Sequence, residues 1–242
     1  MTAPALLDHL ARFDTPTICN ALDALAPETR LRGYTRRPLV AAPETWRAPE
    51  GRRALCAPAR TVRIRASVPP PRSDAETRAL KADYYDWIAA GGPSMMVIED
   101  LDPEPMGAFW GEVNTALHRG LGALGVVTNG VVRDLDDLDP GFLVLAGAVG
   151  PSHAHVHWVD FGAGARVFGM EVADGDVVHA DRHGAVRLPA PALEGLPDAV
   201  AEVQRRERPA IEAARAGLGP RALAERMRAL LGAGEPGTEG HA

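Results

Sequence analysis

The segment from Phe109 to Asp134, FWGEVNTALHRGLGALGVVTNGVVRD, constrains the fold of this chain more than any other stretch. Its pattern predicts a turn rich in backbone N–H groups, a helix, a buried strand and a glycine turn that presents Arg133 beside Asp134. A guanidinium can bind an anionic substrate through paired hydrogen bonds, and a carboxylate can hold a hard divalent cation directly or through water. The segment therefore predicts metal-assisted chemistry on a small carboxylate.

The chain up to residue 90 is expected to form helices, an irregular arm and one strand. Apolar spacing over residues 4–25 predicts two helices that meet at Thr15-Pro16, with Thr15 as the cap of the second helix. Residues 26–53 are rich in Pro, Arg and Gly without a clear period, which predicts an irregular arm. Ala54 to Ser67 alternates as a strand does, and Asp74 to Ala90 has the apolar spacing of a helix.

Short apolar runs and turn signals mark the strands in the rest of the chain. We expect strands at Met95–Ile98, at GVVTN after Gly122, at Leu143–Val149, once or twice within Val156–Met170, and in hairpins around Asp174-Gly175 and His183-Gly184. A helical region is expected from Pro191 to about Leu231. The tail at 232–242 cannot bury apolar surface and is predicted to be disordered.

The order of these elements indicates the α/β class. Strands and helices alternate through the middle of the chain, and antiparallel strands follow. This order favours a layered αββα-type sandwich with a mixed sheet, N-terminal helices and a C-terminal helix. Residues 1–231 are predicted to form a single domain that includes the arm at 26–53.

The composition excludes several classes of protein. The net charge of −6 gives no basic surface for nucleic acid. Cys19 and Cys56 are too few and too far apart for a disulfide framework or a zinc site. The N-terminus carries charges where a signal peptide needs an apolar core, and no apolar run reaches the length of a membrane span. We therefore expect a cytoplasmic protein.

Three motifs resemble those of one protein family. They are WGE at 110–112, GVVTNGVVRD at 125–134 and GDVVHADRHGAVRLP at 175–189. In these motifs the chain resembles the family of the regulator of ribonuclease activity A (RraA) and the 4-hydroxy-4-methyl-2-oxoglutarate aldolases, over roughly residues 5–215. The 22 positions between Gly111 and Arg133 match the spacing between the family's substrate turn and its Arg-Asp pair.

The resemblance implies a role for each residue of this site. A pyruvate-like carboxylate or keto oxygen would bind to the backbone N–H groups of Gly111, Glu112, Val113 and Asn114. Arg133 would bind the keto-acid oxygens and stabilise the enolate, and Asp134 would anchor Mg²⁺ or Mn²⁺. Glu112 stands where the family usually has an aspartate close to the metal, so its longer side chain could shift the coordination.

The resemblance also implies an oligomer. Family members form trimers or hexamers, in which the C-terminal helix of a neighbouring subunit supplies another acid to the site. Glu207 is the best candidate for that acid, and Glu202 and Glu212 are alternatives. The expected partners are therefore a small 2-oxo-acid substrate and further copies of the chain.

Other polar residues have competing interpretations. In a strand, His153, His155 and His157 would share one face, as metal ligands do, although packing or a subunit interface explains them better. Asp100 ends a strand near the presumed pocket, where it could support the site or simply close a turn. The acidic residues after Asp134 lack a full calcium-loop pattern and are expected to be solvated.

The resulting hypothesis is a divalent-metal-dependent class II pyruvate aldolase with oxaloacetate decarboxylase activity, acting on a small 4-hydroxy-2-oxo acid. Lys81 is the only lysine and lies before the motif, which disfavours a Schiff-base aldolase. One alternative is a non-enzymatic, RraA-type protein-binding regulator. Another is a related metal-dependent lyase or isomerase that acts on a different oxo-acid.

Overall fold

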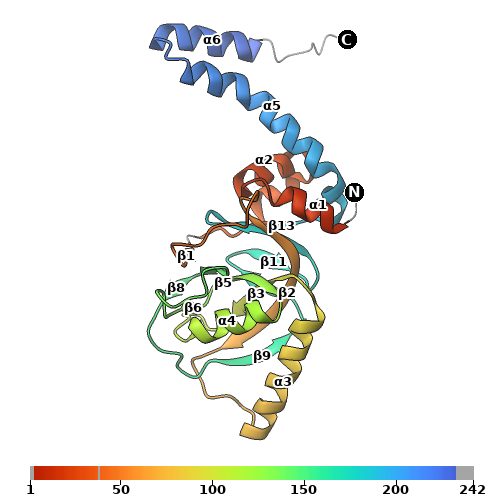
Figure 1. Cartoon of the computed structure of the whole chain (residues 1–242), viewed down its shortest axis with the longest axis vertical. Helices are drawn as coiled ribbons and strands as arrows, with labels where there is room; N and C mark the ends of the chain where they lie inside the picture. The colour runs from red at the N-terminus through yellow and green to blue at the C-terminus, as the bar shows by residue number, and fades with distance from the viewer. Residues whose placement is uncertain (1–2, 38, 233–242) are drawn as a thin grey trace.

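One long strand, β2 (Leu55–Arg65), organises the sheet. One edge of β2 pairs in parallel with β3 (Ser94–Asp100). The other edge pairs antiparallel with β12 (Val177–Asp181) near the start of β2 and with β9 (His157–Phe161) near its end. Figure 1 shows the resulting curled sheet in the computed structural model, which describes residues 3–37 and 39–232.

Four strands at the centre of this sheet run parallel, in the order β7 (Leu143–Ala146), β5 (Ala123–Thr128), β3 and β2. β1 (Val40–Ala42) pairs antiparallel with β7, and β13 (Gly184–Leu188) pairs antiparallel with β12. Central parallel strands are covered on both faces, so their sequences are continuously apolar. The mixed sheet predicted from the order of the elements is confirmed.

The two faces of the sheet are covered by different elements. α3 (Asp74–Ala90) packs Tyr84 onto one face, and its predicted bounds are confirmed. The other face packs against a hairpin formed by β10 (Ala165–Val167) and β11 (Met170–Val172). Trp46 from the arm joins this second core with only 3% of its surface exposed.

The predicted N-terminal helices are confirmed as α1 (Ala3–Leu10) and α2 (Thr15–Leu25), but the predicted cap is wrong. Asp14 caps α2, because its Oδ1 accepts a hydrogen bond from the Thr17 backbone N–H at 3.0 Å. A carboxylate before the first turn also complements the helix dipole. Thr15 is already helical, and its N–H donates to Asp181 Oδ2 at 2.8 Å.

Two other segments differ from the sequence-based expectations. The arm at 26–53 contains a short 3₁₀ helix, Pro27–Leu31, as well as β1, so it is only partly irregular. The strand predicted over Leu143–Val149 breaks at Gly147, and its last two residues form β8 (Ala148–Val149) in another sheet. A side chain at Gly147 would clash with the Asn129 carbonyl, so the backbones approach closely there.

The C-terminal region contains two helices, where one helical region was predicted. After a 3₁₀ turn at Ala190–Gly195, α5 (Leu196–Arg215) packs against α2, and α6 (Pro220–Gly232) folds back from its end. Gly217 separates the helices with a φ of +71°, a conformation that interrupts a right-handed helix. α6 buries no residue, and Figure 1 shows both helices extending away from the sheet.

The tail predicted to be disordered lies outside the described residues, apart from Gly232. No helix within residues 3–37 and 39–232 is long and apolar enough to cross a membrane.

Candidate functional site

A small parallel sheet sits beside the main one and carries the predicted site. Its strands are β4 (Ala108–Trp110), β6 (Val131–Val132) and β8. β6 is the middle strand, and it pairs with β4 on one side and with β8 on the other. All three strands point the same way, so their carboxyl ends lie at one edge.

The structure brings the two halves of the motif together at this edge. Gly111 follows β4 and is the N-cap of α4 (Glu112–Gly120), while Arg133 and Asp134 follow β6. The Arg133 backbone N–H donates to the Trp110 carbonyl at 2.9 Å, which fixes the two turns side by side.

Asp134 forms the centre of the contact. Its Oδ2 accepts a hydrogen bond from the Glu112 N–H at 3.3 Å and lies 3.3 Å from Arg133 Nε. Its φ is +53°, in the left-handed region that Asp enters more readily than most residues. A Cβ at position 111 would collide with Asp134 Oδ2, so only glycine allows this approach.

The first turn of α4 offers further hydrogen-bond donors. Within residues 3–37 and 39–232, the backbone N–H groups of Val113 and Asn114 have no acceptor. Such groups, together with the positive end of the helix dipole, favour an anion. The Glu112 N–H differs from the expectation, because Asp134 already accepts from it, and a substrate oxygen would have to share or displace that bond.

Both charged side chains remain accessible to solvent. The side chain of Arg133 is 36% exposed and that of Asp134 is 38% exposed. An ion pair this exposed contributes little to stability. Its value therefore lies in presenting a guanidinium and a carboxylate to a ligand.

The donor set is compatible with Mg²⁺ or Mn²⁺. No group of three or more His, Cys, Asp or Glu residues able to hold a metal occurs in the described part of the chain. Mg²⁺ typically binds through one or two carboxylates, the substrate and several waters. Asp134 fits that mode because Oδ1 makes no hydrogen bond within the described residues.

The other two predicted metal ligands are not joined to Asp134 within the chain. The Glu112 carboxylate makes no ion pair or hydrogen bond to any described residue. Glu207 lies on α5, where its Oε1 accepts a 3.4 Å hydrogen bond from Asn20 of α2. Figure 1 shows α4 beside the sheet, whereas α5 extends away from the sheet beyond α1 and α2. A role for Glu207 therefore requires a neighbouring copy, as the sequence analysis expects.

Buried residues that the sequence analysis did not select hold this turn in place. Thr115 Oγ1 lies 3.0 Å from the Gly111 carbonyl and accepts the Asp139 N–H at 3.1 Å. His118 Nδ1 lies 2.6 Å from the Asn114 carbonyl. Its Nε2 lies 2.8 Å from the Tyr84 hydroxyl. Thr115 and His118 could have been identified from the sequence, because they are polar residues on the face of an amphipathic helix that is expected to be buried.

The remaining candidates lie elsewhere or have structural roles. His153 and His155 are exposed and precede β9, whereas His157 is a buried residue of that strand, so the three do not form a metal site. Asp100 ends β3 beside Gly130, at the amino end of β6, and its Oδ1 accepts the Asp102 N–H at 3.0 Å. Burial raises the pKa of Asp100 to about 6.

The acidic residues after Asp134 divide into two groups. Asp136 and Asp137 are exposed, as expected. Asp139 is not simply solvated, because it forms an ion pair with Arg119 and accepts the Gly141 N–H.

Comparison with known proteins agrees with the motif. A sequence model of the family described as RraA-like, Aldolase/RraA, matches residues 15–187 of the 242-residue chain, which include the segment from Gly111 to Asp134 but not Glu207. The chain belongs to the RraA-like family. This family includes both aldolases and regulators of RNase E, and its aldolases are metal-dependent. Among curated proteins, none matches this RraA-like chain.

Solved structures share the fold. An uncharacterized protein from Pseudomonas syringae pv. tomato str. DC3000 superposes with a TM-score of 0.69 at 18% identity, over 94% of both chains. Streptomyces coelicolor RraAS2, called an unusual member of the RNase ES inhibitor RraA protein family, superposes with a TM-score of 0.64 at 18% identity. That match covers 84% of this chain and 94% of RraAS2. At these identities the likeness concerns the fold alone.

Proposed function

We propose that this RraA-like protein is a divalent-metal-dependent lyase that cleaves a small 4-hydroxy-2-oxo acid to pyruvate and also decarboxylates oxaloacetate. One observation carries the proposal. The guanidinium of Arg133 and the carboxylate of Asp134 meet at the N-terminus of α4, where two backbone N–H groups lack acceptors in the described structure.

The substrate would bind through its oxygens. Arg133 would donate hydrogen bonds to the 2-oxo acid through its Nη groups, which have no partner among the described residues. The Val113 and Asn114 N–H groups would bind the other oxygens at the positive end of the helix dipole. A guanidinium and fixed amide donors together orient a planar carboxylate with its neighbouring keto group.

When the 4-hydroxyl group loses its proton to solvent, C4 becomes the carbonyl carbon of the departing oxo product and the C3–C4 bond breaks. The electrons of that bond form the enolate of pyruvate, with negative charge on its keto oxygen, and a proton from solvent at C3 then gives pyruvate. Bound Mg²⁺ or Mn²⁺ would polarise the 2-oxo carbonyl. Asp134 would hold the cation, and Arg133 would stabilise the developing enolate oxygen. Donors that are already oriented toward developing charge lower the barrier, because they need no reorganisation during the reaction.

The position of Lys81 supports a metal-dependent route over a Schiff base. Lys81 belongs to α3, and its Nζ lies 5.6 Å from the centre of the Tyr85 ring. The chain contains no other lysine. The one lysine therefore belongs to α3 and not to the turns that carry Arg133 and the start of α4, which disfavours an imine with the substrate.

Completion of the site by a neighbouring subunit is part of the proposal. Glu207 is the proposed acid, in a trimer or hexamer. Of the two alternative acids, Glu202 is already paired with Arg205 on the same helix, because its Oε2 lies 2.8 Å from Arg205 Nε. Glu212 remains the alternative donor.

The test is pyruvate release from oxaloacetate and from 4-hydroxy-4-methyl-2-oxoglutarate, with added Mg²⁺ and with EDTA. We expect release with Mg²⁺ that EDTA abolishes. Release from oxaloacetate alone would keep the site and indicate a different aldol substrate. Absence of release from both, in folded protein supplied with metal, would contradict the proposal.

A protein-binding regulator is the second candidate function, since the family contains such proteins. Val113 and Leu117, which are 66% and 42% exposed, lie four positions apart on α4 beside the site, so they form a small apolar surface that another protein could contact. A protein that releases no pyruvate but inhibits an RNase E-type ribonuclease would favour this function.

A further inference from the structure

A second cavity lies away from the Arg133–Asp134 site, at the carboxyl ends of the main parallel strands. β3 ends at Asp100, β5 ends just before Asn129, and β7 ends just before Gly147. Asn129 and Gly147 line a cavity of about 660 Å³ that opens there. Ligands of parallel α/β sheets commonly bind outside the carboxyl ends of the strands, and the volume suits a metabolite-sized molecule.

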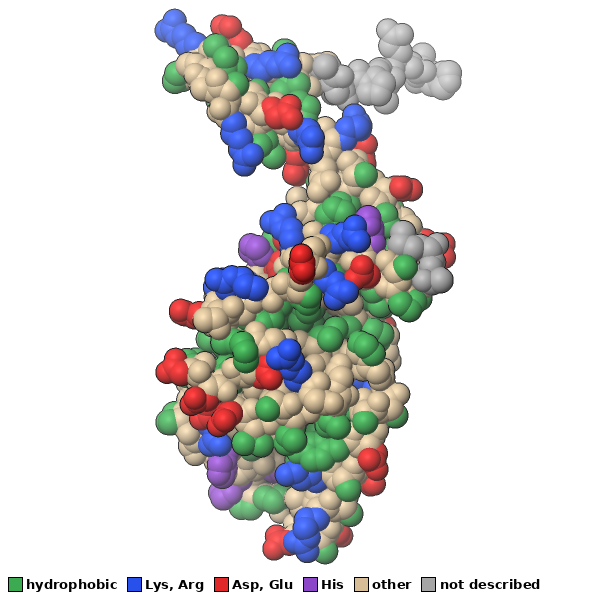
Figure 2. Space-filling model, viewed as in Figure 1, with side chains coloured by type: hydrophobic (Ala, Val, Ile, Leu, Met, Phe, Trp, Pro, Cys, Tyr) green, Lys and Arg blue, Asp and Glu red, His purple; other side chains and the backbone are tan. Residues whose placement is uncertain are grey.

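Three arginines give this cavity its chemistry. Arg36 and Arg37 come from the arm before β1, and Arg166 comes from β10. Within residues 3–37 and 39–232, no carboxylate pairs with Arg36 or Arg37. Arg166 is partly neutralised, because its Nε lies 3.6 Å from Glu171 Oε1. Figure 2 shows basic side chains, interspersed with acidic ones, across the middle of the molecule.

Among the described residues, Asp102 is the one carboxylate that lines the cavity, and it is already hydrogen-bonded. Asp102 accepts hydrogen bonds from the N–H groups of Ala66 and Ser67, both at 2.7 Å, and from the Ser67 hydroxyl at 2.6 Å. Its side chain is 2% exposed. The accessible charge of the cavity is therefore positive.

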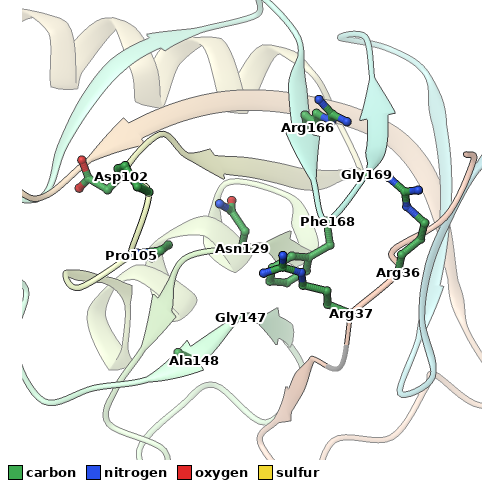
Figure 3. A pocket seen from close by; sticks show the side chains of 11 residues that line it. Arg36, Arg37, Asp102, Pro105, Asn129, Gly147, Ala148, Arg166, Phe168 and Gly169 are labelled. Atoms are coloured by element: carbon green, nitrogen blue, oxygen red, sulfur yellow. The ribbon is translucent and has the colours of Figure 1, made fainter.

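Phe168 positions two of the arginines. Its carbonyl accepts the Arg36 N–H at 3.1 Å, and its ring centre lies 5.8 Å from the Arg37 guanidinium carbon. Figure 3 shows Arg37 beside the ring and Arg36 reaching toward Gly169. A Cβ at Gly169 would collide with the Arg36 guanidinium, so that side chain lies directly against the backbone.

The backbone conformation of Phe168 indicates that the fold itself fixes the position of this ring beside Arg36 and Arg37. Its φ is +45°, which a bulky side chain rarely adopts. The ring lies over Gly147, where an added Cβ would be 2.9 Å from Phe168 Cζ. Unfavourable backbone conformations of this kind concentrate at ligand sites and switch regions.

We propose that this cavity binds a small oxyanion with more than one negative group, such as a pyrophosphate or a polycarboxylate, between Arg36, Arg37 and Arg166. Guanidinium groups bind such oxygens through paired hydrogen bonds. The aromatic ring and the nearby prolines would contact an apolar part of the ligand. Neither Arg133 nor Asp134 lines this cavity, and the proposal is independent of the lyase activity proposed for those two residues.

The test is isothermal titration of the full-length protein with inorganic pyrophosphate and with citrate, at constant ionic strength set by chloride. We expect saturable binding of at least one probe, and the two probes distinguish a phosphate ligand from a carboxylate ligand. The double substitution Arg36→Ala and Arg37→Ala should weaken the binding of that probe at least tenfold. Arg78→Ala, an exposed arginine of α3, is the matched control and should bind as the wild type does.

Arg133→Ala separates the two sites in the same titration. It should retain binding, because Arg133 does not line this cavity. Three results would overturn the proposal. They are no saturable binding of either probe, equal binding by the Arg36/Arg37 double variant with native circular dichroism, and loss of binding in Arg133→Ala alone.

Discussion

Gly111 and Asp134 fit against each other so closely that a single methyl group on residue 111 would occupy the place of Asp134 Oδ2. The helix α4 and the strands β5 and β6 separate the two residues in the sequence, and the parallel pairing of β4 with β6 brings them together. The helix N-terminus and the carboxylate therefore form one structural unit.

Gly111→Ala tests this unit. The new Cβ should displace the Asp134 carboxylate and reduce kcat/KM for pyruvate release at least a hundredfold. Because the Asp134 side chain, with which the new methyl group collides, is partly exposed and can move aside, the free energy of unfolding should fall by no more than about 1–2 kcal/mol. Urea denaturation and steady-state kinetics measure the two effects. Gly120→Ala, at the other end of α4 with open space around it, is the control and should keep its activity.

Arg133→Ala and Asp134→Asn should each abolish turnover while the fold remains intact. Both side chains are exposed and their ion pair contributes little to stability, so circular dichroism and the unfolding midpoint should match the wild type. Asp136→Asn removes an equally accessible charge two positions away and should retain at least half of the activity. Wild-type rates in either site variant would exclude this site.

Unfolding at acidic pH should report two buried histidines. Burial lowers the pKa of His118 and of His179 to about 4, from 6.5 in a solvent-exposed histidine. Above pH 6.5 the two histidines are neutral in the folded and in the unfolded chain. Between pH 6.5 and 4 they are protonated in the unfolded chain but remain largely neutral in the folded chain. The free energy of unfolding should therefore fall in that range, by on the order of 2 kcal/mol per histidine at pH 5.

Asp100 acts in the opposite direction and provides the internal check. Its raised pKa, about 6, means that the folded chain binds a proton more readily than the unfolded chain between pH 6 and 4. Asp100→Asn should remove this compensation and make the acid-side loss steeper in urea titrations. If the free energy of unfolding did not depend on pH in either the wild type or Asp100→Asn, this result would contradict the burial of His118, His179 and Asp100.

The local part of the site was predictable from the sequence. The glycine turns at Gly111 and Gly130 and the apolar strand between them determine where Arg133 and Asp134 emerge, so a short segment contains most of the required information. Sequence reasoning placed the second helix cap at Thr15 because Thr-Pro resembles a helix start. Asp14, one residue earlier, caps the helix.

Long-range contacts were not predictable in the same way. The cavity of Arg36, Arg37 and Arg166 joins the arm to a hairpin about 130 positions further along the chain. Charge and spacing within the arm carry no sign of that contact. The break at Gly147 was also missed, because an apolar run does not reveal that another backbone approaches it.

Mixed oligomers can test whether a neighbour supplies the acid. Ile211 and Leu231, 44% and 73% exposed, leave apolar surface on the extended C-terminal helices for a second copy. Asp134→Ala and Glu207→Ala should each be inactive alone. Co-expressed in one oligomer, they should regain a substantial fraction of the activity, on the order of a quarter, because some sites then contain both native residues.

The control for complementation uses the alternative acid. If Glu207 is the donor, a mixed oligomer of Glu212→Ala and Asp134→Ala should be no more active than the Glu212→Ala oligomer alone. Full activity of Glu207→Ala as a pure oligomer would remove this residue from the site.

The most direct measurement is the affinity for Mn²⁺ of the wild type, Asp134→Asn and Arg133→Ala. Electron paramagnetic resonance measures this affinity with and without pyruvate. If Asp134 holds the cation and Arg133 with the α4 N–H groups holds the 2-oxo acid, the wild type binds Mn²⁺ and pyruvate tightens that binding. Asp134→Asn should lose at least tenfold in affinity, and Arg133→Ala should lose the effect of pyruvate. Equal Mn²⁺ affinity in all three proteins, with no response to pyruvate, would contradict a metal-dependent keto-acid site at this turn.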